Sequence, residues 1–419
     1  EIEFSDWSSD VCSSDLFSIA MLMLALASAT NWVVLVCGSE GFGNYRHHAD
    51  IAHAYQIVKA GGIDPDHIIT MMYNDVPFSK QNPFPGKLYN HPGDDVPDVY
   101  EGVVVDYEKD TVSPANLIKV LTGDESAGGK VLKSTEEDNV FLFFSDHGGA
   151  DILALPGGYL HSKDLLDAIN TMHEKKMYKK FVLYIEACYS GSMFLNLPED
   201  INVVAVTAAN DHESSWGWYC GGEAVVHGKA LGTCLGDEFS VYWMEDADKG
   251  EQKTETLEEQ FNRLVKGVTK SHVMRYGDKS FANDVIGEFI GYPEGKKVEH
   301  QMSYETWDSR DNEMLFRLYK AQHTTGKEQK MWQAAYEEEV ANRKAIDAYF
   351  ASLTTEPRMY QPASNVKNVN CYKKAIDQFT GAMGRSDYAL KYFNVLANIC
   401  NENRSEERRV GKECRSRWS

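Results

Sequence analysis

Two apolar runs of this sequence end in the side chains best suited to chemistry. The run KFVLYIEAC ends in Glu186 and Cys188, and the run NVFLFFSDHGG ends in His147, Gly148 and a second glycine. A thiol attacks as the thiolate, and a neighbouring imidazole makes that form accessible. Cys188 and His147 are therefore candidates for a nucleophile and its base, with Glu186 shaping the pocket beside them. The backbone N–H groups of Gly148 and Cys188 would form an oxyanion hole.

These residues need strands to bring them together, and the sequence predicts an α/β fold. Short apolar runs ending at Gly or polar residues indicate strands, and capped periodic segments between them indicate helices. The expected strands cover 31–38, 67–73, 139–149, 180–188 and 201–210. The expected helices cover 51–60 capped at Asp50, 113–123, 161–177 capped at Ser162, and 257–272. This alternation predicts a mainly parallel sheet covered by helices on both faces.

Parallel strands place their carboxyl ends along one edge of the sheet, which is where ligands bind. His147 and Cys188 each follow an expected strand, and the segment GSEGFGNYRHHAD (38–50) follows the first one. We therefore expect all three to meet at that edge. The glycines of GSEGFG fit neither a dinucleotide-binding nor a Walker pattern, so they indicate a turn.

The C-terminal third has a different pattern. From Tyr304 onward the periodicity is helical only, over 304–322, 328–353, 371–382 and 387–402. The sequence therefore predicts a boundary near 290–325 between an α/β domain and a helical domain.

The composition and the two ends of the chain limit the classes of function that the sequence allows. The formal net charge of -21 argues against nucleic-acid binding, which needs a basic face. Residues 1–16 and 404–419 resemble translated sequencing adapters, and we expect them to be artefacts; the alternative is natural disordered tails. Residues 17–29 end in an A-x-A pattern and are too short to span a bilayer. They are interpreted as a signal-peptide remnant, with a first core strand or helix as the alternative.

Cysteine spacing agrees with a secreted protein. Setting aside the two cysteines in the terminal segments, six remain, too few for a disulfide scaffold in a chain of this length. Cys220 and Cys234 flank one loop, and Cys371 and Cys400 flank a helical pair, so we expect two bridges; free thiols at the first pair are the alternative. Cys37 lies within an apolar run and is interpreted as a buried thiol. Cys188 is left unpaired, as a reactive thiol would be.

Five motifs in order, NYRHHAD, SDHGG, EACYSGS, TAANDHESS and MRYGD, resemble the legumain family of asparaginyl endopeptidases. The resemblance is dense over 31 to about 290 and weak in the helical tail to about 403. It implies a caspase-like α/β catalytic domain over 30–290. It also implies a linker or activation segment at 291–325 and a helical pro-domain at 326–403.

The resemblance also assigns roles to residues. Cys188 would be the nucleophile, His147 the general base, Asn44 the residue that orients the histidine, and Gly148 the oxyanion-hole donor. The pocket for the side chain before the cleaved bond would consist of Arg46, His47, Glu186, Ser215 and Asp237. Such a pocket offers donors and acceptors for an Asn carboxamide, while Asp would fit only when protonated, at low pH.

The expected activity is therefore hydrolysis after Asn through a thioester, by a zymogen that acid activates. The tail would cover the cleft, and acid would weaken that cover by protonating carboxylates paired across it. The resemblance implies protein or peptide substrates, cystatin-type inhibitors, no cofactor, and a lysosome-like or vacuole-like compartment or secretion. The alternatives are an asparaginyl ligase or transamidase on the same site, and a silent binding protein.

Some residues have simpler interpretations, and some depart from the family pattern. Arg46 and Glu186 could form a structural ion pair. The adjacent histidines His47 and His48 predict no metal site, because no Cys or carboxylate stands at ligand spacing. Glu40 and Phe42 replace residues usual in relatives, outside the catalytic position. The segment 216–234 is longer than expected and borders the pocket.

Overall fold

The computed structural model describes residues 30–295, 304–363 and 365–402. Its centre is a six-stranded sheet in the order β13-β8-β7-β3-β1-β2. These strands are β1 (Asn31–Cys37), β2 (Ile68–Met72), β3 (Asn139–Ser145), β7 (Lys180–Glu186), β8 (Val203–Thr207) and β13 (Met274–Gly277). Strands β1, β2, β3, β7 and β8 run parallel, and β13 is antiparallel at one edge. The inner strands are buried along nearly their whole length, as strands covered on both faces should be.

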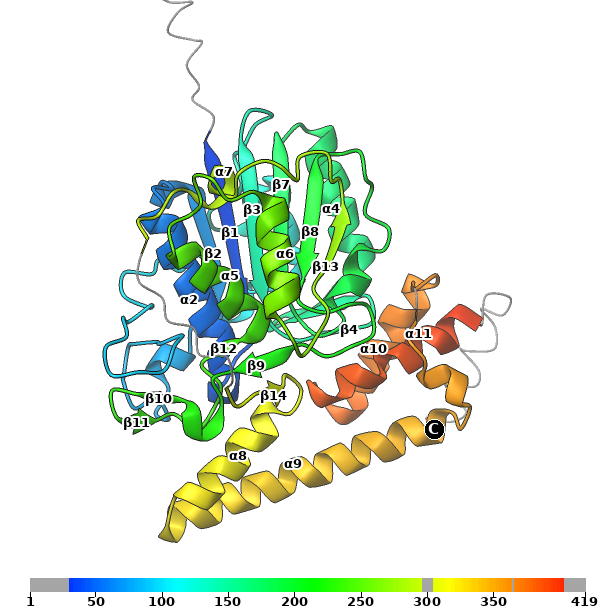
Figure 1. The fold of residues 1–419 in the computed structure, drawn as a ribbon. Helices are drawn as coiled ribbons and strands as arrows, with labels where there is room; N and C mark the ends of the chain where they lie inside the picture. The colour runs from blue at the N-terminus through cyan, green and yellow to red at the C-terminus, as the bar shows by residue number, and fades with distance from the viewer. Residues whose placement is uncertain (1–29, 296–303, 364, 403–419) are drawn as a thin grey trace, which may run out of the picture.

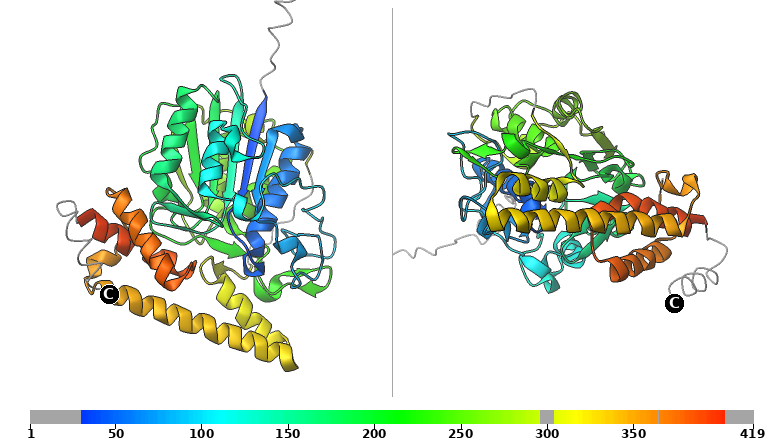
Figure 2. Two further views of the ribbon diagram at one scale, coloured as in Figure 1. Left: turned by 180° about the vertical axis from the view of Figure 1, so that it is seen from behind. Right: turned by 90° about the horizontal axis from the view of Figure 1, so that it is seen from below.

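Helices cover both faces of this sheet (Figures 1 and 2). One face carries α2 (Tyr45–Ala60), α5 (Glu238–Asp248), α6 (Leu257–Gly267) and the short α7 (Gly287–Ile290). The other face carries α3 (Pro114–Thr122) and α4 (Ser162–Glu174). Each face has its own core of buried aliphatic and aromatic side chains, so the carboxyl edge of the sheet is held rigidly between two packed layers.

Small antiparallel sheets surround the carboxyl edge. One contains β4 (Gly148–Gly149), β5 (Ile152–Leu155) and β6 (Gly158–His161). A second has the order β12-β9-β14, with β9 (Trp216–Trp218), β12 (Gly236–Asp237) and β14 (Trp307–Asp308). The hairpin β10 (Val225–Val226) and β11 (Lys229–Ala230) lies nearby in the chain. A disulfide joins Cys220 to Cys234 across this region.

The C-terminal helices lie below the carboxyl edge of the sheet (Figure 1). They are α8 (Asn312–His323), α9 (Gly326–Leu353), α10 (Val369–Met383) and α11 (Phe393–Glu402). A second disulfide joins Cys371 to Cys400, as the sequence predicts. Their apolar core also includes Ala150, Ile152 and Ala154 of the α/β part, so the helical part is packed onto the α/β part through buried side chains.

The predicted α/β class, with a mainly parallel sheet and a helical C-terminal part, is confirmed. Three local predictions are wrong. Asp50 does not cap α2 but lies buried inside it, and α4 begins at Ser162, whose hydroxyl donates to the carbonyl of Met193. Residues 304–311 are not helical, because Trp307 and Asp308 pair with β9. The sequence analysis also did not predict α5 or the small sheets.

The predicted signal remnant and the predicted terminal artefacts lie outside the described residues. Among the described helices, none is both long and apolar enough to cross a membrane.

Candidate active site

The two predicted reactive residues follow neighbouring strands. Ser145, the last residue of β3, lies opposite Glu186, the last residue of β7, and Asp146 N donates to Glu186 O at 3.1 Å. His147 and Cys188 follow within two residues of these strand ends, so the carboxyl edge brings them together as predicted. Both are buried, with exposed fractions of 3% for His147 and 0% for Cys188.

Gly148 fills the space between these two residues. A Cβ at this position would lie 2.2 Å from the carbonyl oxygen of Cys188, so only glycine allows the two backbones to approach this closely. Ala154 N donates to His147 O, which places Gly148 at the alternate, non-bonded position of the β4–β5 pair. Its N–H therefore points away from β5, as an oxyanion-hole donor beside Cys188 would need.

Asn44 fixes the protonation of the His147 ring. Nε2 of His147 lies 2.9 Å from Oδ1 of Asn44, and Nδ2 of Asn44 donates to Glu40 O at 3.0 Å. Arg46 Nη1 also donates to the same Oδ1, at 3.3 Å. Oδ1 is thus an acceptor, so Nε2 of His147 carries the proton and Nδ1 is left as a base. Nδ1 is buried and has no hydrogen-bond partner among the described residues.

Cys188 lies in a buried environment that favours its protonated form. Its Sγ accepts from Ser215 N at 3.2 Å and lies 3.7 Å from Ser215 Oγ. Burial raises the pKa of the Cys188 thiol, and the nearby Arg310 guanidinium lowers it by less. Burial likewise lowers the pKa of His147, followed by repulsion from Arg46 and Arg310. The thiolate–imidazolium pair is therefore disfavoured while the site is covered.

The predicted pocket residues also come together, behind Cys188. Arg46 Nε donates to Oδ1 of Asp237 at 2.9 Å, and both side chains are fully buried. Oε2 of Glu186 accepts from Ser240 N and Ser240 Oγ, so its partner is not Arg46, the structural alternative raised above. Oε1 of Glu186, Oδ2 of Asp237 and Nε2 of His47 are buried without a hydrogen-bond partner among the described residues, although the last two lie 3.5 Å apart as an ion-pair contact.

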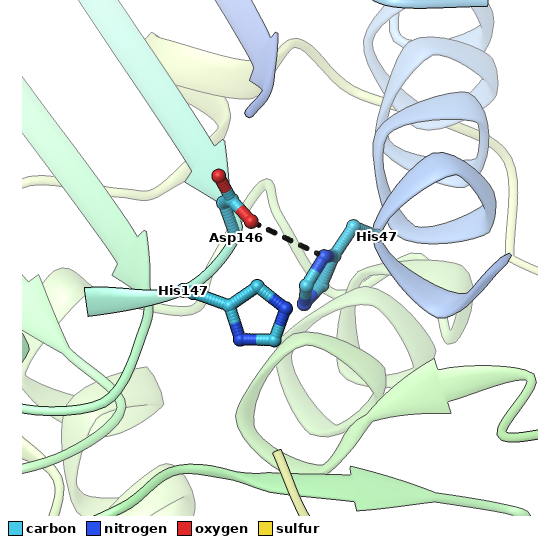
Figure 3. Close-up of side chains that lie close together, drawn as sticks. All are labelled: His47, Asp146 and His147. Carbon is cyan, nitrogen blue, oxygen red and sulfur yellow. Dashed lines mark ion pairs between the residues drawn. The ribbon is translucent and has the colours of Figure 1, made fainter. Parts of the chain in front are cut away.

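His47, Asp146 and His147 form a tight buried cluster (Figure 3). One ligand atom from each lies within 4.8 Å of the others, so the fold supplies the carboxylate that sequence spacing did not. However, Nδ1 of His47 already lies 2.8 Å from Ser39 Oγ, and Nε2 of His147 is bonded to Asn44. The rings are 5.0 Å apart in an edge-on arrangement. These contacts fit a hydrogen-bonded support of His147 better than a metal site.

A segment from the C-terminal part crosses this site as an added strand. Trp307 and Asp308 of β14 pair antiparallel with β9, and Ser309 N donates to Ser215 O at 3.1 Å. Ser309 Oγ lies 3.2 Å from Ser215 Oγ and donates to Asp237 Oδ1 at 3.4 Å, so its side chain enters the predicted pocket. Its carbonyl oxygen accepts from Arg46 Nη2 at 3.3 Å.

Two more residues of the C-terminal part reach the reactive groups. Arg310 donates to Gly148 O at 3.4 Å and lies over the Tyr189 ring, with its guanidinium carbon 4.7 Å from the ring centroid. Oδ2 of Asp387 lies 3.2 Å from Nε2 of His147. The closed cleft therefore holds a strand, a cation and a carboxylate from the C-terminal part.

Comparison with known proteins agrees with this geometry. The model of the Peptidase C13 family matches residues 31–331. The chain belongs to the Peptidase C13 family. The vacuolar-processing enzyme delta-isozyme of Arabidopsis thaliana is 39% identical over 412 residues, covering 90% of this chain and 87% of that protein. Legumain of Mus musculus is 39% identical over 393 residues, covering 88% of each. This C13 peptidase is a cysteine-type endopeptidase of the asparaginyl endopeptidase class.

Two further matches cover a smaller share of this chain. The hemoglobinase of Schistosoma japonicum is 43% identical over 270 residues, covering 64% of this C13 chain and 62% of that protein. Among solved structures, caspase-1 from Spodoptera frugiperda aligns with a TM-score of 0.36 and 8% identity. That alignment covers 64% of this chain and 92% of the caspase chain.

Sequence reasoning placed every predicted site residue of this C13 peptidase at one edge but missed those that close it. Ser309, Arg310 and Asp387 lie in the helical third, more than 115 residues after Cys188. Ser39 and Asp50 were also missed; Asp50 accepts from Asn90 and Ser145 beneath the pocket. Asp50 was predicted as the N-cap of a helix over 51–60, so its place inside α2 beneath the pocket had no signal in the local sequence.

Proposed function

We propose that this C13 peptidase hydrolyses peptide bonds after Asn, through a thioester on Cys188. The observation that carries the proposal is the hydrogen bond from His147 Nε2 to Asn44, which leaves Nδ1 free to act as a base at the strand end next to that of Cys188. His147 takes the thiol proton, and Cys188 attacks the carbonyl carbon. The oxyanion then accepts from the N–H groups of Gly148 and Cys188. His147 returns the proton to the leaving amine, and water hydrolyses the thioester with the same residue as base.

The preference for Asn rests on the buried polar atoms of the pocket. Arg46 and His47 supply donors for the carbonyl oxygen of an Asn side chain, and Glu186 and Asp237 supply acceptors for its NH₂ group. Burial, followed by repulsion from Asp237, raises the pKa of Glu186 well above its ordinary value. A substrate Asp would bring a negative charge into a pocket that already disfavours an ionised carboxylate, so it should be accepted only when protonated. Lys or Ala would leave buried groups unpaired.

A panel of fluorogenic peptides tests this preference. Ala-Ala-Asn, Ala-Ala-Asp and Ala-Ala-Lys are compared from pH 4 to 7 after acid treatment of the full chain. We expect cleavage after Asn throughout, cleavage after Asp only towards acid pH, and none after Lys. Glu186→Gln should lower kcat/KM for Asn by about tenfold to a hundredfold. Glu238→Gln, which neutralises a buried carboxylate just outside the pocket, is the matched control. Equal cleavage after Lys would refute the proposal.

We further propose that residues 30–290 form the catalytic domain, 291–325 the activation segment, and 326–403 a pro-domain that keeps the enzyme latent. The support is that Ser309 enters the specificity pocket while its carbonyl oxygen bonds Arg46 instead of facing Cys188. A bond held in this way is not positioned for attack. Opening in acid would expose the cleft to substrates and, as the family resemblance implies, to cystatin-type inhibitors.

An acidic compartment of the secretory pathway, or secretion, is the proposed location. Two disulfides need an oxidising environment during folding. The matched relatives include proteins named vacuolar-processing enzymes, which is consistent with a vacuole-like or lysosome-like site. The high negative charge suits such a compartment, because self-repulsion falls as carboxylates protonate.

A further inference from the structure

We propose that the Cys220–Cys234 disulfide binds a large apolar side chain two positions before the cleaved Asn, which makes it a second specificity site. This inference rests on the proposed function, since it uses the position of the cleaved residue to number the substrate. We call the surface made by this disulfide and the backbone of Gly217 the disulfide shelf.

The register of the covering strand locates the shelf relative to the pocket. Ser309 occupies the pocket of the residue before the cleaved bond, and its N–H donates to Ser215 O. Trp307, two residues earlier, lies opposite Gly217 in the β14–β9 pair. Cys220 N then donates to Glu305 O at 3.1 Å. A substrate chain pairing with β9 in the same register would therefore place its residue two before Asn at the position of Trp307.

Alternation along a strand decides which side chains face the protein. Ser309 and Trp307 are two residues apart, so they point to the same face, while Asp308 points to the other. Trp307 is 8% exposed and forms a buried apolar cluster with Cys220 and Cys234, both of which are fully buried. Asp308 is only half-buried. The shelf thus lies on the same side of the added strand as the Asn pocket.

Gly217 makes room for the indole. Residues directly opposite in an antiparallel pair place their side chains together on one face, and Gly217 has none. A Cβ on Gly217 would lie 2.7 Å from Sγ of Cys234, so the disulfide occupies the space beneath this residue. A large side chain on the partner strand can then rest against the sulfurs, next to the Asn312 carboxamide of the C-terminal part, which also lies close to this position.

The shelf belongs to the α/β part and stays when the tail leaves. Leu315 of α8 also contacts the cluster, and Trp307 Nε1 donates to Glu305, so these two contacts would be lost to a substrate. The disulfide remains, held beside β9, whose other edge is paired with β12. Polarisable sulfur favours aromatic partners. We therefore assign Trp, Phe, Tyr and Leu as preferred there and Glu or Asp as disfavoured.

A position scan on the acid-treated wild type tests the shelf without any mutation. Four peptides are compared: Ala-Ala-Ala-Asn, Ala-Trp-Ala-Asn, Trp-Ala-Ala-Asn and Ala-Glu-Ala-Asn, each with a fluorogenic leaving group. We expect Trp two before Asn to raise kcat/KM by about tenfold over Ala. Moving the same Trp one residue earlier points it to the opposite face and should abolish the gain.

The failures of the two proposals are distinguishable. If no peptide in the set is cleaved, the proposed function fails. If all are cleaved, but Trp gives equal rates at both positions or none above Ala, the shelf is wrong and the proposed function stands.

A pair of double variants then assigns the effect to the disulfide. In Cys220→Ala/Cys234→Ala the ratio of kcat/KM for Ala-Trp-Ala-Asn over Ala-Ala-Ala-Asn should fall to near one. In Cys371→Ala/Cys400→Ala, which lacks the other disulfide, the ratio should stay near that of wild type. If the first variant does not fold, as judged by its melting transition, Gly217→Ala gives the same test by placing a Cβ against Cys234. An unchanged ratio in the folded variants would overturn the assignment.

Discussion

Asn44 occupies a helix-capping position but uses its side chain to bind His147. It stands at the N-cap of α2, where an Asn side chain normally accepts a hydrogen bond from the first turn. Here it makes no capping bond, and its amide binds His147 and Glu40 instead. Giving up a cap costs about 1 kcal/mol, which a purely structural residue would not do. Such a broken local rule is expected where a side chain serves catalysis.

Replacing Asn44 by Ala should therefore cost activity more than stability. Without Oδ1 the His147 ring loses its fixed tautomer, and kcat/KM for an Asn peptide should fall by about a hundredfold. The pH dependence of kcat/KM should also change, because that bond stabilises the imidazolium. Asn116→Ala, at a half-buried Asn on α3 whose side chain donates to Thr111 O, is the control and should match wild type. Wild-type kcat/KM in Asn44→Ala would remove this residue from the mechanism.

Among the elements that the sequence did not reveal, β14 is the one that enters the site. Residues 304–322 have helical periodicity, yet the helix begins only at Asn312. The strand forms because Trp307 and Asp308 find the free edge of β9, which is 90 residues away in sequence. The strands of the main sheet, in contrast, were predictable from long apolar runs that need no distant partner to be recognised. The local sequence pattern thus predicted the strand ends that carry His147 and Cys188. The strand β14 that covers them depends on pairing with a distant part of the chain.

Breaking the β14–β9 pair should open the cleft. Ser309→Pro removes the N–H that donates to Ser215, so the cover should bind less tightly. We expect the full chain to cleave Asn peptides at neutral pH several times faster than wild type, or to be activated more quickly. Ser309→Ala keeps the N–H and is the matched control. If Ser309→Pro is as latent as wild type, the strand contact is not what closes the site.

At the scale of the whole molecule, the pH response should depend on the buried groups that contact the C-terminal part. Asp151 accepts from Val366 N of the C-terminal part, and burial raises its pKa to about 6. Protonation of Asp151 between about pH 6 and its ordinary 3.8 therefore favours docking of that part. His161 lies against Tyr372 of α10, and burial, followed by Lys373, lowers its pKa to about 4.

Protonation of His161 has the opposite effect on docking of the C-terminal part. Its docked pKa is below the ordinary 6.5, so docking is undisturbed above pH 6.5 and weakens as pH falls from there to about 4. Protonation of His147 should weaken docking in the same way, because burial also lowers its pKa. We therefore predict that acid favours opening of this molecule through the histidines beneath the cover, against the effect of Asp151.

Two substitutions should move acid activation in opposite directions. His161→Gln removes a group that favours release, so activation at pH 5 should slow by about tenfold. Asp151→Asn keeps an acceptor for Val366 but removes the protonation that favours docking, so activation at pH 5 should become faster relative to pH 7. The measurement is the onset of Asn-peptide cleavage against pH for the full chain. A shift of both variants in the same direction would contradict the assignment.

The most direct test of the central claim is covalent capture at Cys188. The acid-treated chain is incubated with an Ala-Ala-Asn chloromethyl ketone and analysed by intact mass and peptide mapping. The account predicts one adduct, on Cys188, formed by wild type, slowed in Asn44→Ala and absent in Cys188→Ala, with loss of activity in proportion to labelling. Labelling at Cys37, or full activity in Cys188→Ala, would contradict it.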